Sequence, residues 1–393
     1  MGGRFTGLAR AQRLLHGEDH LRRLPLRMAE VLFVSKAIAP PWNDSGKNLV
    51  HDLARAMTRH TPTLMVGTQP LSLPHTRSLR VYAGSVGFAP ALLDQARVFA
   101  HLLGARGHAL WHFFFAPNPR SCLAGGLALR ARRKRAVHTI SSAPRDPRAI
   151  VPLLFAEANV VLSSHTERRL LEAGLAPERL VRIAPAITPL SPRTGPERAA
   201  LRDSLGLAQS APLVVFPGDL EFGEGAHLML QTARALGPDV QLVMACRTKT
   251  ERARAAEAKL HARAAELGVA DRVRFVGETP RIHDLLACAD VVALPSVDLF
   301  AKMDYPLVLL EAMSLARCVI VARGSAAEEL ALHGGALAVE AERDALTHTI
   351  GALLSDEDAR DRLGADARAS VCAHYTSVVM AEAYERLYDR LLG

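Results

Sequence analysis

The chain has 393 residues, with 48 Lys and Arg against 40 Asp and Glu, which gives a formal net charge of +8 at pH 7. This length predicts two or three domains, each large enough to bury its own core. A hydrophobic share of 49% with 22% charged residues is typical of globular proteins and excludes wholesale disorder. The five cysteines are widely spaced and form no CxxC pair, which disfavours a disulfide framework and a structural zinc site.

The longest apolar runs of the sequence stop at about 6–10 residues, against about 20 for a transmembrane helix. Residues 1–29 form a basic N-terminal extension without the apolar core or cleavage site of a secretory signal. We therefore expect a cytoplasmic protein, with peripheral binding at the inner face of the membrane as an open alternative.

Short runs rich in β-branched residues alternate with helical patterns over nearly the whole chain. Such alternation is typical of βαβ units whose parallel sheets are buried on both faces. The first series of predicted strands comprises Val31–Ser35, Thr63–Thr68, Leu79–Ala83, Leu110–Phe115, Val137–Ser141, Val160–Ser164 and Val181–Pro185. The second comprises Leu213–Pro217, Gln241–Cys246, Val273–Val276, Val291–Leu294 and Val319–Ala322. Helical patterns between them include Lys47–Arg59, Ala226–Leu236, Glu251–Leu267 and Glu342–Leu354.

The two series are separated by Thr188–Glu197, a proline-rich segment that reads TPLSPRTGPE and is the best linker candidate. We therefore predict an N-terminal domain at 30–190, a C-terminal domain at 191–374 and a C-terminal helix within 375–393. The cleft between the domains is the expected ligand site. In the last helix, Tyr384, Leu387 and Leu391 lie on one apolar face, which needs a protein surface to pack on.

The familiar phosphate-binding and metal-binding motifs are missing from the sequence. Gly218, Gly223 and Gly225 lack the GxGxxG spacing, and Gly46-Lys47 lacks the earlier glycine of GxxxxGK[ST]. A nicotinamide-dependent dehydrogenase and a P-loop ATPase are therefore disfavoured. The 16 histidines include no HExxH or paired ligand spacing, so we expect neither a bound metal nor a resident cofactor.

The segment Pro295–Met313, PSVDLFAKMDYPLVLLEAM, predicts a strand end, a loop and a helix that begins near Pro306. The N–H groups of Leu307 and Val308 would then lie at the positive end of the helix dipole and face the cleft as an anion site. Glu311 follows one turn later, within reach of a polar ligand. An amphipathic helix with a solvated glutamate explains the pattern equally well.

This segment resembles the signature E-x-F-G-x-x-x-x-E-A of the retaining glycosyltransferases of family 4, which have the GT-B fold. The order of three further segments agrees: ADRVRFVG (270–277), ACADVVALPS (287–296) and CVIVARGSAAEEL (318–330). The resemblance covers residues 30–393. It implies an α/β protein with two Rossmann-like domains that face a central cleft, and a last helix that crosses back to the first domain.

The resemblance also implies donor-binding residues for a nucleotide sugar. Glu311 takes the place of the family's second glutamate, which contacts the ribose of the donor, while the first falls on Met303, beside Asp304. Leu307 and Val308 would bind the diphosphate. The remaining donor-binding residues implied are Gly218, Asp304, Gly324 and Ser325.

Two positions depart from the family in a way that affects the charge of the site. The arginine and lysine of G-R-x-x-x-x-K-G, which grip the diphosphate, are replaced by Asp219 and Glu224. Carboxylates at these places would repel a diphosphate. We expect Arg247, Lys249 and Lys302, which follow predicted strands, to supply the missing charge, although residues of this kind are as often solvated surface.

The first domain is expected to hold the acceptor. Ser45, Gly46 and Lys47 stand where the family has a glycine-rich turn into a helix, and a helix cap by Asp44 or Ser45 is a compatible alternative. Ser141 takes the place of the family's catalytic-site histidine. His138 and His112 are the nearby histidine candidates, and either one could instead be a satisfied core residue.

The implied activity is that of a hexosyltransferase, which moves a sugar from a nucleoside diphosphate to a glycan or lipid-linked acceptor with retention of configuration. Two alternatives stay open: a degenerate GT-B module that binds nucleotide, glycan or a partner enzyme without turnover, and a nucleotide-sugar epimerase. The basic residues at 130–135 form a solvated helix end or contact anionic lipid. Nucleic acid is disfavoured as a partner because no recognition helix or stacking motif accompanies the charge.

Overall fold

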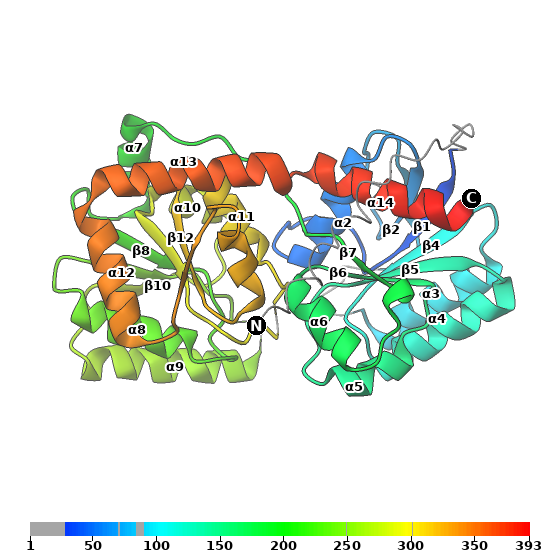
Figure 1. Ribbon diagram of the computed structural model, residues 1–393, viewed down its shortest axis with the longest axis horizontal. Helices are drawn as coiled ribbons and strands as arrows, with labels where there is room; N and C mark the ends of the chain where they lie inside the picture. The colour runs from blue at the N-terminus through cyan, green and yellow to red at the C-terminus, as the bar shows by residue number, and fades with distance from the viewer. Residues whose placement is uncertain (1–27, 70, 84–89, 249, 301) are drawn as a thin grey trace, which may run out of the picture.

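Figure 1 shows the computed structural model of the chain, which describes residues 28–69, 71–83, 90–248, 250–300 and 302–393. Two parallel sheets lie side by side, each covered by helices. Nearly all of the predicted basic extension at 1–29 lies outside the described residues. Among the described residues, no helix is long and apolar enough to span a membrane.

In the described part of the chain, the first sheet has seven parallel strands in the order β3-β2-β1-β4-β5-β6-β7. The chain order reverses between β1 and β4, so the loops after these two strands flank an open position at the carboxyl edge. The strands are β1 (Glu30–Val34), β2 (Thr61–Val66), β3 (Arg77–Arg80), β4 (Leu110–Phe114), β5 (Arg135–Ile140), β6 (Ala158–Val161) and β7 (Leu180–Arg182). The helices are α2 (Ser45–Ala56), α3 (Leu92–Gly104), α4 (Pro119–Arg132), α5 (Pro147–Ile150) and α6 (Ser164–Glu172).

The second sheet has six parallel strands among the described residues, in the order β10-β9-β8-β11-β12-β13. Here the order reverses between β8 and β11, which brings the loops after these strands together. The strands are β8 (Leu213–Phe216), β9 (Gln241–Met244), β10 (Val273–Phe275), β11 (Val291–Leu294), β12 (Cys318–Ala322) and β13 (Leu337–Val339). The helices of this domain are α7 (Gly195–Leu205), α8 (Gly225–Ala235), α9 (Glu251–Glu266), α10 (Ile282–Cys288), α11 (Leu307–Ser314), α12 (Arg343–Ser355) and α13 (Glu357–His374), and α14 (Ser377–Leu392) follows them in the chain.

All twelve predicted strands are present, with ends that differ from the prediction by a few residues. The central strands are wholly buried because helices cover both faces, which explains their continuous apolar runs. The sequence analysis missed β13, a half-buried edge strand of three residues that is too short to show a period. The expectation of two Rossmann-like parallel sheets is confirmed.

The segment between the sheets has no helix or strand at 188–194, and α7 then starts with a capping box. Thr194 accepts a hydrogen bond from the Glu197 N–H, and the Glu197 carboxylate accepts one from the Thr194 N–H at 2.7 Å. The domain division at 190/191 agrees with this break and remains a prediction.

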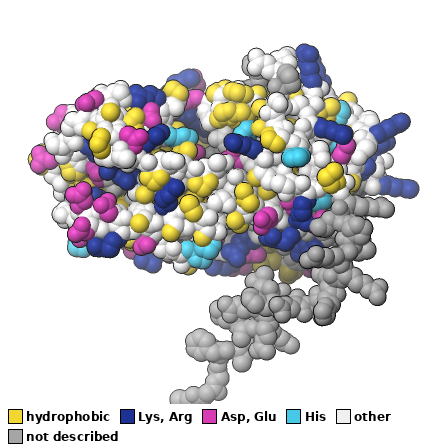
Figure 2. Space-filling view, turned by 90° about the horizontal axis from the view of Figure 1, so that it is seen from above, with side chains coloured by type: hydrophobic (Ala, Val, Ile, Leu, Met, Phe, Trp, Pro, Cys, Tyr) yellow, Lys and Arg dark blue, Asp and Glu magenta, His cyan; other side chains and the backbone are white. Residues whose placement is uncertain are grey.

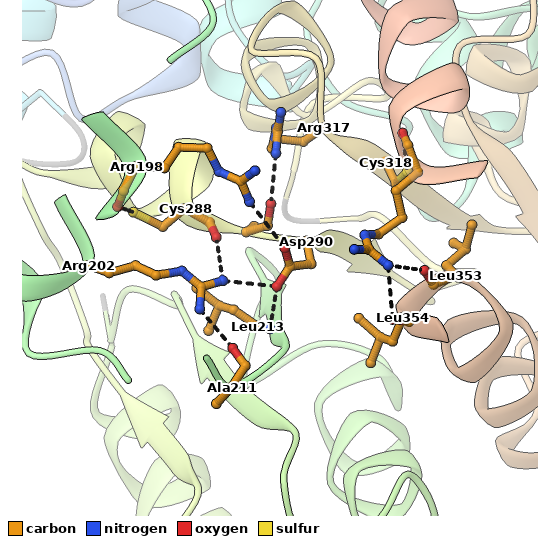
Figure 3. Close-up of polar contacts among 12 residues, drawn as sticks. Arg198, Arg202, Ala211, Leu213, Cys288, Asp290, Arg317, Cys318, Leu353 and Leu354 are labelled. Carbon is orange, nitrogen blue, oxygen red and sulfur yellow. Dashed lines mark hydrogen bonds and ion pairs between the residues drawn. The ribbon is translucent and has the colours of Figure 1, made fainter. Parts of the chain in front are cut away.

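A buried polar network fastens α7 to the amino ends of the second sheet, opposite the cleft (Figure 3). The Asp290 carboxylate, just before β11, accepts hydrogen bonds from Arg202 at 2.9 Å, Arg198 at 3.1 Å and the Leu213 N–H at 2.8 Å. Arg202 also donates to the carbonyls of Ala211 and Cys288. The Asp290 carboxylate is therefore paired with two arginines, and the buried Arg202 is also hydrogen-bonded to backbone carbonyls.

The last helix crosses back to the first domain, as the resemblance implied (Figure 1). The crossing is fixed where Ile187 donates its N–H to the Tyr375 carbonyl and accepts from the Ser377 N–H, at 3.0 and 2.8 Å. α14 then lies against α2, with Tyr384 and Leu387 buried. Its Glu385 carboxylate accepts the N–H groups of residues 58, 59 and 60. The predicted packing of this helix face is confirmed.

Candidate functional site

A cavity of about 1380 Å³ lies between the facing carboxyl edges of the two sheets. One wall comes from segments that follow β1, β4 and β5, and the other from segments that follow β8, β9, β10 and β11. Both reversals of strand order open into it. Parallel sheets bind ligands at such positions, because loops and helix starts converge there.

The start of α11 forms part of the second wall, where Pro306, Leu307, Val308 and Glu311 line the cavity. Pro306 precedes the first helical residue, as the sequence predicted, and no side chain caps the N-terminus. The first amides of this helix have no partner within it and carry its positive dipole end. The wall is therefore suited to a negatively charged group.

Two basic residues line the same wall. The Lys302 ammonium donates to the Pro217 carbonyl at 3.3 Å, and burial lowers the pKa of Lys302 although Asp219 opposes this shift. Arg247 follows β9 and is near enough to the opposite loop to lower the pKa of Asp44. A partly buried cation is stabilised by a bound anion, so these residues favour a phosphate-bearing ligand. Lys249 lies outside the described residues.

The two acidic replacements lie in different places. Asp219 lines the cavity, and its carboxylate accepts the N–H groups of Glu221 and Phe222 at 2.8 and 3.1 Å, which fixes the loop after β8. Glu224 precedes α8 and is not among the cavity-lining residues. Gly218 also lines the cavity, and a Cβ there would lie 1.8 Å from the Phe216 ring, so only glycine fits.

Glu311 has a partner that the sequence analysis did not predict. Its carboxylate lies 3.4 Å from Nε2 of His283, a residue of α10 that also lines the cavity. The hydrogen bond to Glu311 raises the pKa of His283, against the effect of partial burial. Sequence reasoning could not find this pair, because α10 and α11 approach each other only in the folded domain.

The first loop of the N-terminal domain forms the opposite wall, where Ser45 and Gly46 line the cavity. Asp44 caps α2 by accepting the Lys47 N–H at 3.0 Å, so the cap expected as a compatible alternative is present. Burial opposes ionisation of Asp44, but the Lys36 ammonium 2.7 Å away brings its pKa below the usual value. Lys47 is not among the cavity-lining residues, and its ammonium donates to the carbonyls of Ala39 and Pro41.

The C-terminal part of this architecture matches a known family. Residues 197–370 match the family described as "Glycosyl transferases group 1". This match spans all six described strands of the second sheet.

Two curated relatives are similar over part of the chain. A D-inositol 3-phosphate glycosyltransferase of Xylanimonas cellulosilytica is 33% identical over 189 residues, 47% of this chain and 43% of the relative. An N-acetyl-alpha-D-glucosaminyl L-malate synthase of Bacillus anthracis is 32% identical over 128 residues, 32% of each chain. This chain spans about half or less of the length of the curated relatives that it matches.

Solved structures match over nearly the whole chain. The Anabaena HepE protein in complex with UDP and glucose has a TM-score of 0.74 at 18% identity, and the match covers 92% of this chain and 99% of that one. Sucrose-phosphate synthase from Thermosynechococcus elongatus has a TM-score of 0.70 at 20% identity, covering 93% and 99%. The fold is GT-B, as the resemblance implied.

In this GT-B fold, the structure brings only one of the three expected catalytic residues to the cavity. Ser141 lines it, whereas His112 and His138 lie in the interior. His112 bonds to the hydroxyls of Tyr388 and Thr139, at 2.6 and 2.7 Å. Burial lowers the pKa of both imidazoles, to about 4 for His138. Their positions are those of neutral core residues, the open alternative of the sequence analysis.

Three expected donor-binding residues also lie away from the cavity-lining set: Asp304, Gly324 and Ser325. The buried Asp304 carboxylate points to the first domain, where it accepts the Ser163 hydroxyl at 2.7 Å and the Ala143 N–H at 3.0 Å. Gly324 donates to Glu328, and the Ser325 hydroxyl donates to the Ala322 carbonyl. Each has its hydrogen bonds within the protein, so direct contact with the donor has no support from their positions.

No group of three or more His, Cys, Asp or Glu among the described residues is arranged to hold a metal ion. The carboxylates along the cavity wall are engaged: Asp219 with backbone, Glu311 with His283, and Glu278 with the Asn43 amide across the cleft. The cavity can therefore bind an anion through amides and cations on one side and a second ligand on the other.

Proposed function

We propose that this chain is a retaining glycosyltransferase that moves a hexosyl group from a nucleoside diphosphate to an acceptor bound by the first domain. One observation carries the proposal: a single cavity between the two sheets joins the α11 amides, Arg247, Lys302 and Glu311 to the Ser45–Gly46 turn opposite. The names of the relatives support it, since they are glycosyltransferases or a glucosaminyl malate synthase.

The diphosphate is placed against the start of α11. The Leu307 and Val308 amides donate to its oxygens. Arg247 and Lys302 neutralise its charge, because the positions of the family's arginine and lysine hold Asp219 and Glu224 in this chain. The Glu311 carboxylate accepts hydrogen bonds from the ribose hydroxyls. These groups stabilise the charge that develops as the sugar leaves, which lowers the barrier of the reaction.

Retention is proposed to proceed by departure and attack on the same face of the sugar. The lining carboxylates all have partners within the protein, which supports a reaction without a covalent sugar intermediate. The protein then acts by aligning the acceptor with the anomeric carbon and by stabilising the leaving group. Ser141, on the acceptor side of the cavity, is placed to orient the attacking hydroxyl.

The deciding experiment measures nucleotide release from a panel of nucleotide sugars, with and without a panel of glycan and lipid-linked acceptors. UDP-sugars come first because the most similar structures described above include one solved with UDP and glucose. Acceptor-dependent nucleotide release with a new glycoside supports the proposal. Binding without release indicates a degenerate module, and acceptor-independent release with an altered free sugar indicates an epimerase; either result overturns it.

A further inference from the structure

Helices α3 and α4 of the first domain expose an unusual share of the large apolar side chains. Leu92 and Leu93 of α3 are 71% and 73% exposed, Leu123 of α4 is 67% exposed, and Leu103 and Leu127 are also exposed. Leu102 is the buried residue of α3, in a helix of 13 residues. Large apolar side chains exposed together on neighbouring helices indicate an interaction site.

We define the α3–α4 face as the exposed leucines of these two neighbouring helices: Leu92, Leu93, Leu103, Leu123 and Leu127. The two helices pack side by side at the end of the molecule (Figure 1). Leu92 and Leu103 are three turns apart on one side of α3, and Leu123 and Leu127 are one turn apart on α4. Arg120 and Arg130 lie three residues beyond each end of the α4 pair, on the same side.

The charge of this domain suits an anionic surface. Residues 30–190 hold 20 Lys and Arg against 9 Asp and Glu, whereas residues 191–393 hold 22 against 29. Figure 2 shows Lys and Arg side chains projecting from the end formed by the first domain, while Asp and Glu gather toward the other end. Leucines framed by arginines fit a lipid interface, in which the leucines enter the acyl region and the guanidinium groups reach the phosphates.

The large cavity reaches into the same pair of helices. Its wall there is mostly apolar, from Val98 and Phe99 of α3, Phe113 and Phe115 at the end of β4, and Ala124 of α4. The polar lining residues of this region are Gln95, Asn118, Arg120 and Ser121, from α3 and the start of α4. The Tyr82 hydroxyl in this region already donates to the Ser35 carbonyl. Between the aromatic and aliphatic side chains of this wall, a hydrocarbon chain would find the apolar contacts that favour its burial.

We propose that the acceptor is a lipid, that the α3–α4 face docks on an anionic bilayer, and that the apolar part of the acceptor enters the cavity between α3 and α4. The head of such a lipid would then meet the donor at Ser141. That the bound lipid is the acceptor of the sugar rests on the proposed function, but the docking and the binding of an apolar chain do not.

The docking is tested by co-sedimentation with vesicles of phosphatidylcholine, with and without phosphatidylglycerol. Wild type should sediment with the anionic vesicles. The variant with Leu92, Leu93, Leu123 and Leu127 all changed to Ser should lose at least about tenfold in affinity for them. Leu332→Ser is the matched control, because this exposed leucine lies on the second domain. Equal binding by the quadruple variant, or no binding by wild type, overturns the proposal.

Binding of an apolar chain in the cavity between α3 and α4 is tested by calorimetry with monomeric dioctanoyl phosphatidylglycerol. Ala124→Trp fills the space between α3 and α4 and should abolish binding of this lipid while vesicle docking persists. Ala258→Trp, on the exposed side of α9, is the control for fold and for indole substitution. Undiminished lipid binding by Ala124→Trp overturns the proposal that the lipid chain binds between α3 and α4. UDP binding is measured for wild type and for the same variants, which separates the proposed transferase function from the proposed lipid binding. Absence of UDP binding in wild type counts against the transferase function alone.

Discussion

Glu311 lines the cavity one turn into α11 and beside His283, where we propose that the donor binds. We expect Glu311→Ala to weaken nucleotide binding by about 1–3 kcal/mol, because a hydrogen bond to a charged group is lost. Calorimetry with UDP measures this directly. Unchanged affinity in a folded variant would remove Glu311 from the donor site.

Lys302 and Arg247 are the cations that the proposal substitutes for the usual pair. Changing both to alanine should reduce UDP affinity below detection by calorimetry, and any residual activity should become less sensitive to salt. Asp219→Asn keeps an oxygen for the Glu221 and Phe222 amides but removes the negative charge, so it should tighten UDP binding. Full affinity in the double alanine variant would show that the charge comes from elsewhere.

The pair of His283 and Glu311 should also give a pH dependence to stability. Because the folded state raises the pKa of His283 above its usual value of about 6.5, the pair stabilises the fold at lower pH. That contribution is lost as the pH rises through the folded-state pKa. The melting temperature of wild type should therefore exceed that of His283→Gln by more at pH 5.5 than at pH 8.5. A gap that is constant with pH would contradict the pairing.

At the scale of elements, α6 is a helix of the first domain whose N-terminus is held by carboxylates of the second. Glu329 accepts the Ser164 and His165 N–H groups, and Asp304 accepts the Ser163 hydroxyl. A carboxylate at a helix N-terminus is favoured by the dipole and by the unsatisfied amides. These contacts exist only while the domains are together, so they stabilise the closed arrangement.

We expect the variant with Asp304→Ala and Glu329→Ala to open the cleft. Small-angle scattering should show a larger radius of gyration, and the first amides of α6 should exchange faster with deuterium. Glu328→Ala is the matched control, because the Glu328 carboxylate binds the Gly324 N–H within its own domain. Equal scattering and exchange in the double variant would show that the domains are held by other contacts.

The elements were predictable from the sequence where the physical signal is local. The β-branched runs gave every strand but β13, and Pro306 marked the start of α11. The direction of a side chain across a sheet is not local. His112 lies on a strand that the sequence predicted, yet whether it faces the cleft or α14 depends on which helix covers that face. The partner of Glu311 was hidden for the same reason.

At the scale of the whole molecule, α14 joins the second domain to the first. Removing residues 378–393 exposes the surface that Tyr384, Leu387 and Tyr388 cover, and leaves the amides bound by Glu385 without their carboxylate. We expect the melting temperature to fall by several degrees or more, since three large apolar side chains lose their burial. Tyr388→Phe, which loses only the bond to His112, should cause a smaller fall. An unaltered melt after truncation would show that the helix contributes nothing.

The crossing at Ile187 and Tyr375 has a consequence for how the molecule can be divided. The chain leaves the first domain and re-enters it at neighbouring points, joined by hydrogen bonds between Ile187 and both Tyr375 and Ser377. Topologically, the second domain is an insertion into a first domain that is completed by α14. Excising residues 189–374 and joining the cut ends with a short glycine spacer should yield a lobe that folds by itself. The two adjacent crossings are then the covalent links between the lobes, and a hinge between them is expected at this place.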